Sequence, residues 1–231
     1  MNHRFIPALA AAVFFPASAY AHDLWIEKKG AEYVLQYGHR GGELMPIEAA
    51  KLKAVTCVDA KGAKSDFLPG ASFQPKAVTF KGTCACLSAF YHGGFFSLTP
   101  DGEQNLPKNK VNDAVKSWES REFVKFVDAA AAGAQKPVGE QIEIVPVTNL
   151  TKLKEGDKAT FKVLVDGAPV AGAAVARDHN PVGETGSAGE IRLKVKAAGL
   201  QVIDATVKKR IDSPEADNLV VTATIVFEVP R

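Results

Sequence analysis

The sequence from His22 to His39 reads HDLWIEKKGAEYVLQYGH. Two runs of aromatic and branched residues, 24–27 and 33–37, flank a Lys-Lys-Gly turn, and this pattern is typical of a β-hairpin. Because antiparallel strands place the start of one beside the end of the next, the hairpin brings His22 close to His39. The functional prediction depends on that pair of imidazoles.

The remainder of the first half predicts further strands and one helix. Short apolar segments separated by glycine turns are expected to be strands. These segments are residues 52–58, 77–80, 84–91 and 95–98. Between residues 111 and 128 the apolar residues recur at mixed helical spacing, which predicts a helix there.

From residue 138 the pattern changes to short alternating segments between Gly or Pro turns, which is typical of a β-sandwich. The segments are residues 141–147, 159–165, 173–177, 190–195, 201–208 and 220–229. The sequence therefore predicts a mainly β protein with two β-sandwich-like domains and one short helix between them. The first domain covers residues 22–135, and the second, immunoglobulin-like, covers residues 138–231.

The first 21 residues predict a secretory signal peptide. An apolar run from Phe5 to Phe15 follows Arg4, is too short to span a bilayer, and leads to the small-x-small sequence 19–21. Cleavage there makes His22 the first residue of a mature protein exported to the periplasm. No later stretch is long and apolar enough to span, and no Cys follows the cleavage site, so no membrane anchor is expected.

Charge and composition limit which kinds of binding partner are expected. The chain has 28 Lys and Arg against 26 Asp and Glu, and the expected signal removes only Arg4. A nearly neutral mature chain gives no support to a nucleic-acid partner. The hydrophobic content of 46% is enough for folded cores.

The chain has three cysteines, Cys57, Cys84 and Cys86. In an oxidising compartment two of them are expected to pair. If 84–86 is a strand, its two cysteines point to opposite faces, so the expected disulfide joins Cys57 to one of them. A soft-metal thiolate site is the alternative.

Three histidines are candidate metal ligands: His22, His39 and His92. At a new N-terminus, His22 offers both its α-amine and its ring nitrogen to one ion, a chelate suited to nickel or copper. The other two lie at strand ends beside glycines, which let ring and backbone take positions that bulkier neighbours forbid. A fourth, His179, contributes only if the two domains fold against each other.

Two carboxylates near the first strand, Asp23 and Glu27, are candidates for orienting an imidazole by accepting its second ring proton. The chain has no zinc-protease His-Glu-x-x-His run, no Gly-x-Ser-x-Gly elbow and no phosphate-binding glycine loop. The sequence therefore predicts a binding protein and not an enzyme.

The start AHDLWIE (21–27) and the segments 161–175 and 186–190 resemble the periplasmic components associated with nickel and cobalt uptake. The resemblance implies an all-β protein that captures the metal and passes it to a membrane transporter. It carries over to His22 and, through the Tyr-Gly-His sequence after the hairpin, to His39. The expected ion is Ni²⁺, with Co²⁺ or Cu²⁺ as alternatives.

Two other functions stay open at this point. A copper oxygenase also uses an N-terminal histidine, its amine and a second histidine on a β-sandwich, here with Tyr37 or Tyr91 near the metal. An adhesion or scaffold module would make the histidines incidental. The sequence also leaves open whether the metal arrives as a free ion or as a chelate.

Overall fold

The computed structural model describes residues 22–131 and 133–230, so the expected signal peptide lies outside the described residues. Nearly all of the regular structure is β-strand, as predicted. The helices found in these residues are single 3₁₀ turns, Ala49–Lys51, Leu68–Gly70, Lys108–Lys110 and Leu150–Lys152. None of them is long and apolar enough to cross a membrane.

The strands form three sheets. The N-terminal sheet has the order β1-β2-β7-β6, with β3 beside β2. Its strands are β1 (Asp23–Lys29), β2 (Glu32–Gly38), β3 (Leu44–Met45), β6 (Ser72–Gln74) and β7 (Ala77–Lys81).

The central sheet has nine strands in the order β15-β14-β17-β18-β10-β8-β4-β5, with β9 beside β8. Its strands are β4 (Leu52–Val58), β5 (Lys64–Asp66), β8 (Cys86–Thr99), β9 (Gly102–Gln104), β10 (Lys116–Val127), β14 (Ala174–Arg177), β15 (Asn180–Glu184), β17 (Gly199–Arg210) and β18 (Asn218–Val229). The small sheet pairs β12 with β11, β13 and β16. These are β11 (Ile142–Pro146), β12 (Lys158–Val165), β13 (Ala168–Pro169) and β16 (Glu190–Lys194).

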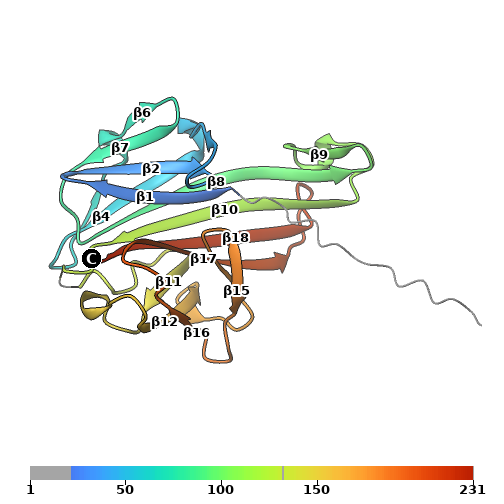
Figure 1. The fold of residues 1–231 in the computed structure, drawn as a ribbon. Coiled ribbons are helices and arrows are strands. Elements are labelled where there is room, and N and C mark those ends of the chain that lie inside the picture. The colour runs from blue at the N-terminus through green and yellow to red at the C-terminus, as the bar shows by residue number, and fades with distance from the viewer. Residues whose placement is uncertain (1–21, 132, 231) are drawn as a thin grey trace, which may run out of the picture.

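The central sheet is buried on both faces, so the molecule has three layers (Figure 1). Successive strand residues point to opposite faces. On β10, Val124 and Phe126 pack toward the N-terminal sheet, whereas Phe123 and Val127 pack toward the small sheet. Each face therefore has its own hydrophobic core.

The predicted helix over residues 111–128 is wrong, because most of this segment is strand β10. It pairs antiparallel with β8 and parallel with β18. A strand that is buried on both faces carries apolar residues without strict alternation, and such a run cannot be told from a helical pattern by periodicity alone. Burial between two layers thus explains the error.

The boundary expected near residue 136 lies in the connection between β10 and β11. Strands from both sides of it form the central sheet, since β10 lies between β8 and β18. The two halves of the chain are therefore joined along the full length of one strand pair, from Trp118 beside Asn218 to Val127 beside Phe227.

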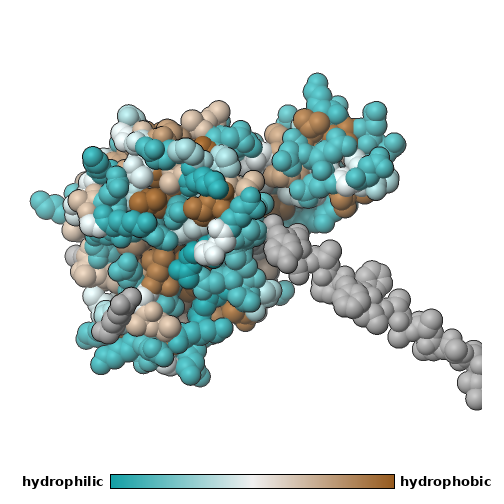
Figure 2. Space-filling view, turned by 45° about the horizontal axis from the view of Figure 1, so that its top comes forward, coloured by the Kyte–Doolittle hydropathy of each residue, from teal (hydrophilic) through white to brown (hydrophobic). Residues whose placement is uncertain are grey.

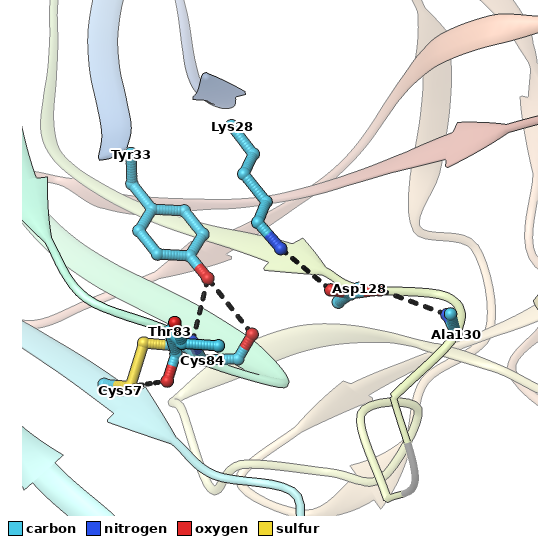
Figure 3. A network of polar contacts seen from close by, with 7 residues as sticks. All are labelled: Lys28, Tyr33, Cys57, Thr83, Cys84, Asp128 and Ala130. Carbon is cyan, nitrogen blue, oxygen red and sulfur yellow. Dashed lines mark hydrogen bonds and ion pairs between the residues drawn. A yellow bond between two sulfur atoms is a disulfide. The ribbon is translucent and has the colours of Figure 1, made fainter. Parts of the chain in front are cut away.

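A disulfide joins Cys57 on β4 to Cys84, one of the two pairings that the sequence allowed. The side chain of Cys84 lies in the core below the N-terminal sheet, and that of Cys86 lies free and buried in the other core. Nearby, the Tyr33 hydroxyl accepts a hydrogen bond from the Cys84 amide (2.9 Å) and donates to its carbonyl (3.1 Å; Figure 3). The disulfide ties β4 to the connection between β7 and β8, and Tyr33 on β2 ties the N-terminal sheet to the same connection.

Strands β8 and β10 continue past the body as an arm, which projects in the space-filling view (Figure 2). The arm begins at a β-bulge, where β8 carries one extra residue between its pairings with Ser120 and Arg121. The turn between β17 and β18 braces it, since Asp217 accepts hydrogen bonds from Lys108 (2.7 Å) and Ser117 (2.6 Å).

Candidate functional site

Three histidine rings gather where the N-terminal sheet meets the central one. His22 lies directly before β1, His39 follows β2, and His179 lies between β14 and β15. The ring centroids of His22 and His39 are 5.0 Å apart, and those of His39 and His179 are also 5.0 Å apart. The predicted hairpin is formed by β1 and β2, and its register places Asp23 opposite Gly38, which explains the first of these contacts.

The loop after β2 holds the His39 ring through its backbone. Gly38 has φ +128°, and a Cβ there would lie 2.4 Å from the carbonyl oxygen of Glu43. The His39 amide donates to that same oxygen at 2.8 Å, and the Gly42 amide donates to the His39 carbonyl at 2.9 Å. Glycine at position 38 is thus required for the tight loop that places the imidazole.

The turn that carries His179 has a strained backbone. Asp178 and His179 have φ of 46° and 64°, the pair of positive values that a two-residue hairpin turn requires and that Asn-Gly normally provides. Residues with a Cβ pay about 1–2 kcal/mol each in this region. The side-chain amide of Asn180 (Nδ2) donates to the carbonyl of Asp178 (2.8 Å) and helps to hold the turn.

Two polar side-chain contacts join this turn to the N-terminal hairpin and the loop that follows it. The Nε2 atom of His179 lies 3.0 Å from Oδ2 of Asp23, and Nη2 of Arg40 lies 2.7 Å from Oδ1 of Asp178. Asp23 follows His22 and Arg40 follows His39, so each contact joins a residue beside one of these histidines to the turn that carries His179. The two loops, more than a hundred residues apart in sequence, are therefore held as one unit.

Two partly buried carboxyl groups, Asp23 and Asp204, lie near one another at the site. Burial raises the pKa of Asp23 to about 7, with help from the negative charges of Asp204 and Asp178. Burial also raises the pKa of Asp204 to about 6, again with a contribution from Asp178. A cation placed among these groups would favour their charged forms and lower their pKa values.

Tyr37 and Glu122 lie beneath the histidines. The Tyr37 ring contacts the rings of His22 and Tyr91, with 5.4 Å between centroids in each case. Burial raises the pKa of Tyr37, and the nearby negative charge of Glu122 adds to the shift. Burial raises the pKa of Glu122 to about 8, and the charge of Asp23 adds to the shift.

The structure does not bring His92 to this cluster. Its neighbour Tyr91 faces Tyr37, so the His92 ring points to the opposite face of the central sheet. There its Nε2 lies 3.0 Å from Oε1 of Glu119, which also accepts from Arg121 at 2.6 Å. The glycine after His92 belongs to the β-bulge, and a Cβ at that position would lie 2.9 Å from the side chain of Ser120.

Of the two carboxylates expected to orient an imidazole, Asp23 lies in the cluster and Glu27 does not. Glu27 instead accepts from the indole nitrogen of Trp25 (3.2 Å) and lies 3.6 Å from the ammonium of Lys29. Sequence reasoning left His179 outside the candidate set. The signal for it was a two-residue turn filled by Asp-His where glycine is normal.

The cluster is not a complete coordination sphere in this conformation. Within residues 22–131 and 133–230, no three His, Cys, Asp or Glu side chains are positioned to hold a metal ion. The donor set still suits one, because imidazole nitrogens bind nickel, cobalt, copper and zinc. Two imidazoles on one ion, each with a nitrogen about 2.0–2.1 Å from it, have centroids about 4.5–5 Å apart, close to the two spacings found.

Comparisons with known proteins give one family. No curated protein and no solved structure matches the chain significantly. The family described as "Domain of unknown function (DUF4198)" matches residues 19–209, which include the three clustered histidines. Because that match spans most of the sequence, the chain belongs to the DUF4198 family.

Proposed function

We propose that this protein binds a divalent transition metal ion, nickel or cobalt, in the periplasm and assists its uptake by a membrane transporter. The ligands are His22, His39 and His179, and the α-amine of His22 joins them when signal cleavage makes it the first residue. The ion is cargo, so the protein is not an enzyme. The membrane partner rests on the family resemblance in the sequence.

The observation that carries the proposal is the gathering of three imidazoles from separate segments at centroid spacings of 5.0 Å. At these spacings, each neighbouring pair of rings is close enough for two of their nitrogens to bind one ion. A chance cluster of histidines has no reason to be built on a strained turn and a glycine-dependent loop. The metal site proposed here therefore replaces His92 with His179.

Asp23 supports the proposal through its contact with His179. Ligating imidazoles usually donate their second ring N–H to a carboxylate, which fixes the tautomer and strengthens the ligand. The Nε2 of His179 lies at hydrogen-bond distance (3.0 Å) from Oδ2 of Asp23, so Asp23 can orient this imidazole in the same way.

The test is calorimetric titration of protein that starts at His22 with nickel, cobalt and copper in separate experiments. We expect His39→Ala and His179→Ala to weaken nickel or cobalt binding at least tenfold. The matched control is His92→Ala, which removes an imidazole from the other face of the sheet and is expected to leave the affinity unchanged. Equal effects of all three substitutions, or no binding by the parent protein, would contradict the proposal.

A second comparison tests the α-amine. One alanine added before His22 is expected to weaken binding at least tenfold, because it removes one arm of the chelate. N-terminal sequencing of the exported protein must first place the processed end at His22. If the copper-loaded protein instead produces peroxide with ascorbate and binds nickel poorly, the oxygenase function is favoured.

A further inference from the structure

Asp204 is a carboxylate that the proposed ligand set does not use. It lies on β17, opposite Thr224 on one side and Ala176 on the other. Val202, two residues earlier, packs in the core below the N-terminal sheet, so Asp204 points from the same face toward that sheet. The carboxylate thus lies on the histidine side of the central sheet.

One oxygen of this carboxylate has no partner. Its Oδ1 atom is buried and makes no hydrogen bond to any described residue. Buried polar atoms in folded proteins are almost always paired, so an orphaned carboxylate oxygen needs an explanation. A ligand that brings a positive charge or a hydrogen-bond donor would provide one.

The charged groups around Asp204 indicate what kind of ligand would bind beside it. Its negative charge acts on Asp23, and that of Asp178 acts on Asp204. The nearby cation Arg40 already contacts Asp178 at 2.7 Å. The carboxyl groups of Asp23 and Asp204 therefore lie beside partly exposed histidines without a lysine or arginine ion pair to any described residue.

We propose that the metal enters this site as a hydrated divalent cation without an organic chelator, and that the Asp204 carboxylate binds this ion directly or through a bound water. This inference rests on the proposed function. Chelators of the polycarboxylate class wrap the metal in further carboxylates, which the buried Asp23 and Asp204 would repel. A free ion instead balances those charges and gives Asp204 Oδ1 either the metal itself or a bound water as its partner.

The experiment uses the chain that begins at His22 and two probes, nickel chloride and preformed nickel citrate. We expect Asp204→Asn, which keeps the shape of the side chain, to weaken nickel binding at least tenfold. The matched control is Asp212→Asn, the same charge change at an exposed residue past the end of β17, about 20 Å or more along the strand. That control is expected to stay within twofold of the parent, and nickel citrate is expected not to bind.

A second readout separates ion binding from a structural role. In metal-free protein, Asp204→Asn removes an unpartnered buried charge, so its melting temperature is expected to equal or exceed that of the parent. A residue that only supported the fold would lower both stability and affinity when changed. The predicted result is a lower nickel affinity without a lower melting temperature.

Three outcomes overturn the inference. Unchanged nickel affinity in Asp204→Asn, or binding of nickel citrate as tight as that of nickel chloride, rejects it while the histidine site of the proposed function stands. Loss of both melting temperature and affinity assigns Asp204 a structural role and also rejects it. A parent protein that binds neither probe rejects the proposed function together with the inference.

Discussion

The strained turn between β14 and β15 predicts that glycine at position 179 gives a more stable protein than alanine does. His179→Gly and His179→Ala both remove the imidazole and its contact with Asp23, so the difference between them reports on the backbone alone. The φ of His179 is 64°. At that angle a residue with a Cβ is destabilised by about 1–2 kcal/mol. Glycine avoids this strain but loses more conformational entropy on folding than alanine, which destabilises it by about 0.5–1 kcal/mol.

The net expectation is that His179→Gly exceeds His179→Ala in free energy of unfolding by about 0.5–1 kcal/mol. For a chain of this size the corresponding difference in melting temperature is roughly 1–4 °C. Urea unfolding of metal-free protein, followed by tryptophan fluorescence, measures it. Nickel titration of the same two variants should show equal loss of affinity, because neither retains the ring.

The matched control is Ala176→Gly on β14, where φ is not in the left-handed region. There glycine is expected to be less stable than alanine by about 0.5–1 kcal/mol. An alanine variant at position 179 as stable as the glycine variant, or more so, would refute the strained turn. It would also remove one argument for a functional role of His179.

Two further predictions concern the rest of the fold. The double substitution Cys57→Ala with Cys84→Ala opens a loop with a sequence separation of 27, so the free energy of unfolding in chemical denaturation should fall by about 3.5 kcal/mol. The control Cys86→Ala keeps the cross-link and should lower the free energy of unfolding by less than about 1.5 kcal/mol. Equal losses in the two proteins would contradict the prediction. Glu122 has its pKa raised by burial from 4.5 to about 8, so its native state holds a proton that the unfolded chain releases. The free energy of unfolding of the parent protein, relative to that of Glu122→Gln, should therefore fall by up to about 5 kcal/mol as the pH rises from about 4.5 to 8. A difference between the two proteins that does not change with pH would show that Glu122 is charged in the folded state.

The sequence was sufficient for features that depend on local pattern. The β1–β2 hairpin follows from two apolar runs around a glycine turn, and its register brings His22 and His39 together. The restriction of the disulfide to Cys57 and one cysteine of the 84–86 run follows from strand alternation, and the two side chains do point into different cores.

What the sequence did not predict depends on contacts between distant segments. The sequence of strand β10 resembles a helical pattern because burial on both faces removes the period of two. His92 resembled a ligand because of its glycines, which in fact serve a β-bulge. His179 reaches the site only because β14 pairs with β17 in the central sheet, a long-range pairing that local periodicity does not reveal.

The parallel pairing of β10 with β18 also has a consequence for how the chain folds. Partners such as Trp118 and Asn218 are separated by a hundred residues, and contacts of that range close slowly because a long loop must first be ordered. Until β18 docks, β10 exposes a bare edge that invites pairing with other chains. A newly made or partly refolded molecule thus lacks the assembled trio of imidazoles and is at its most aggregation-prone.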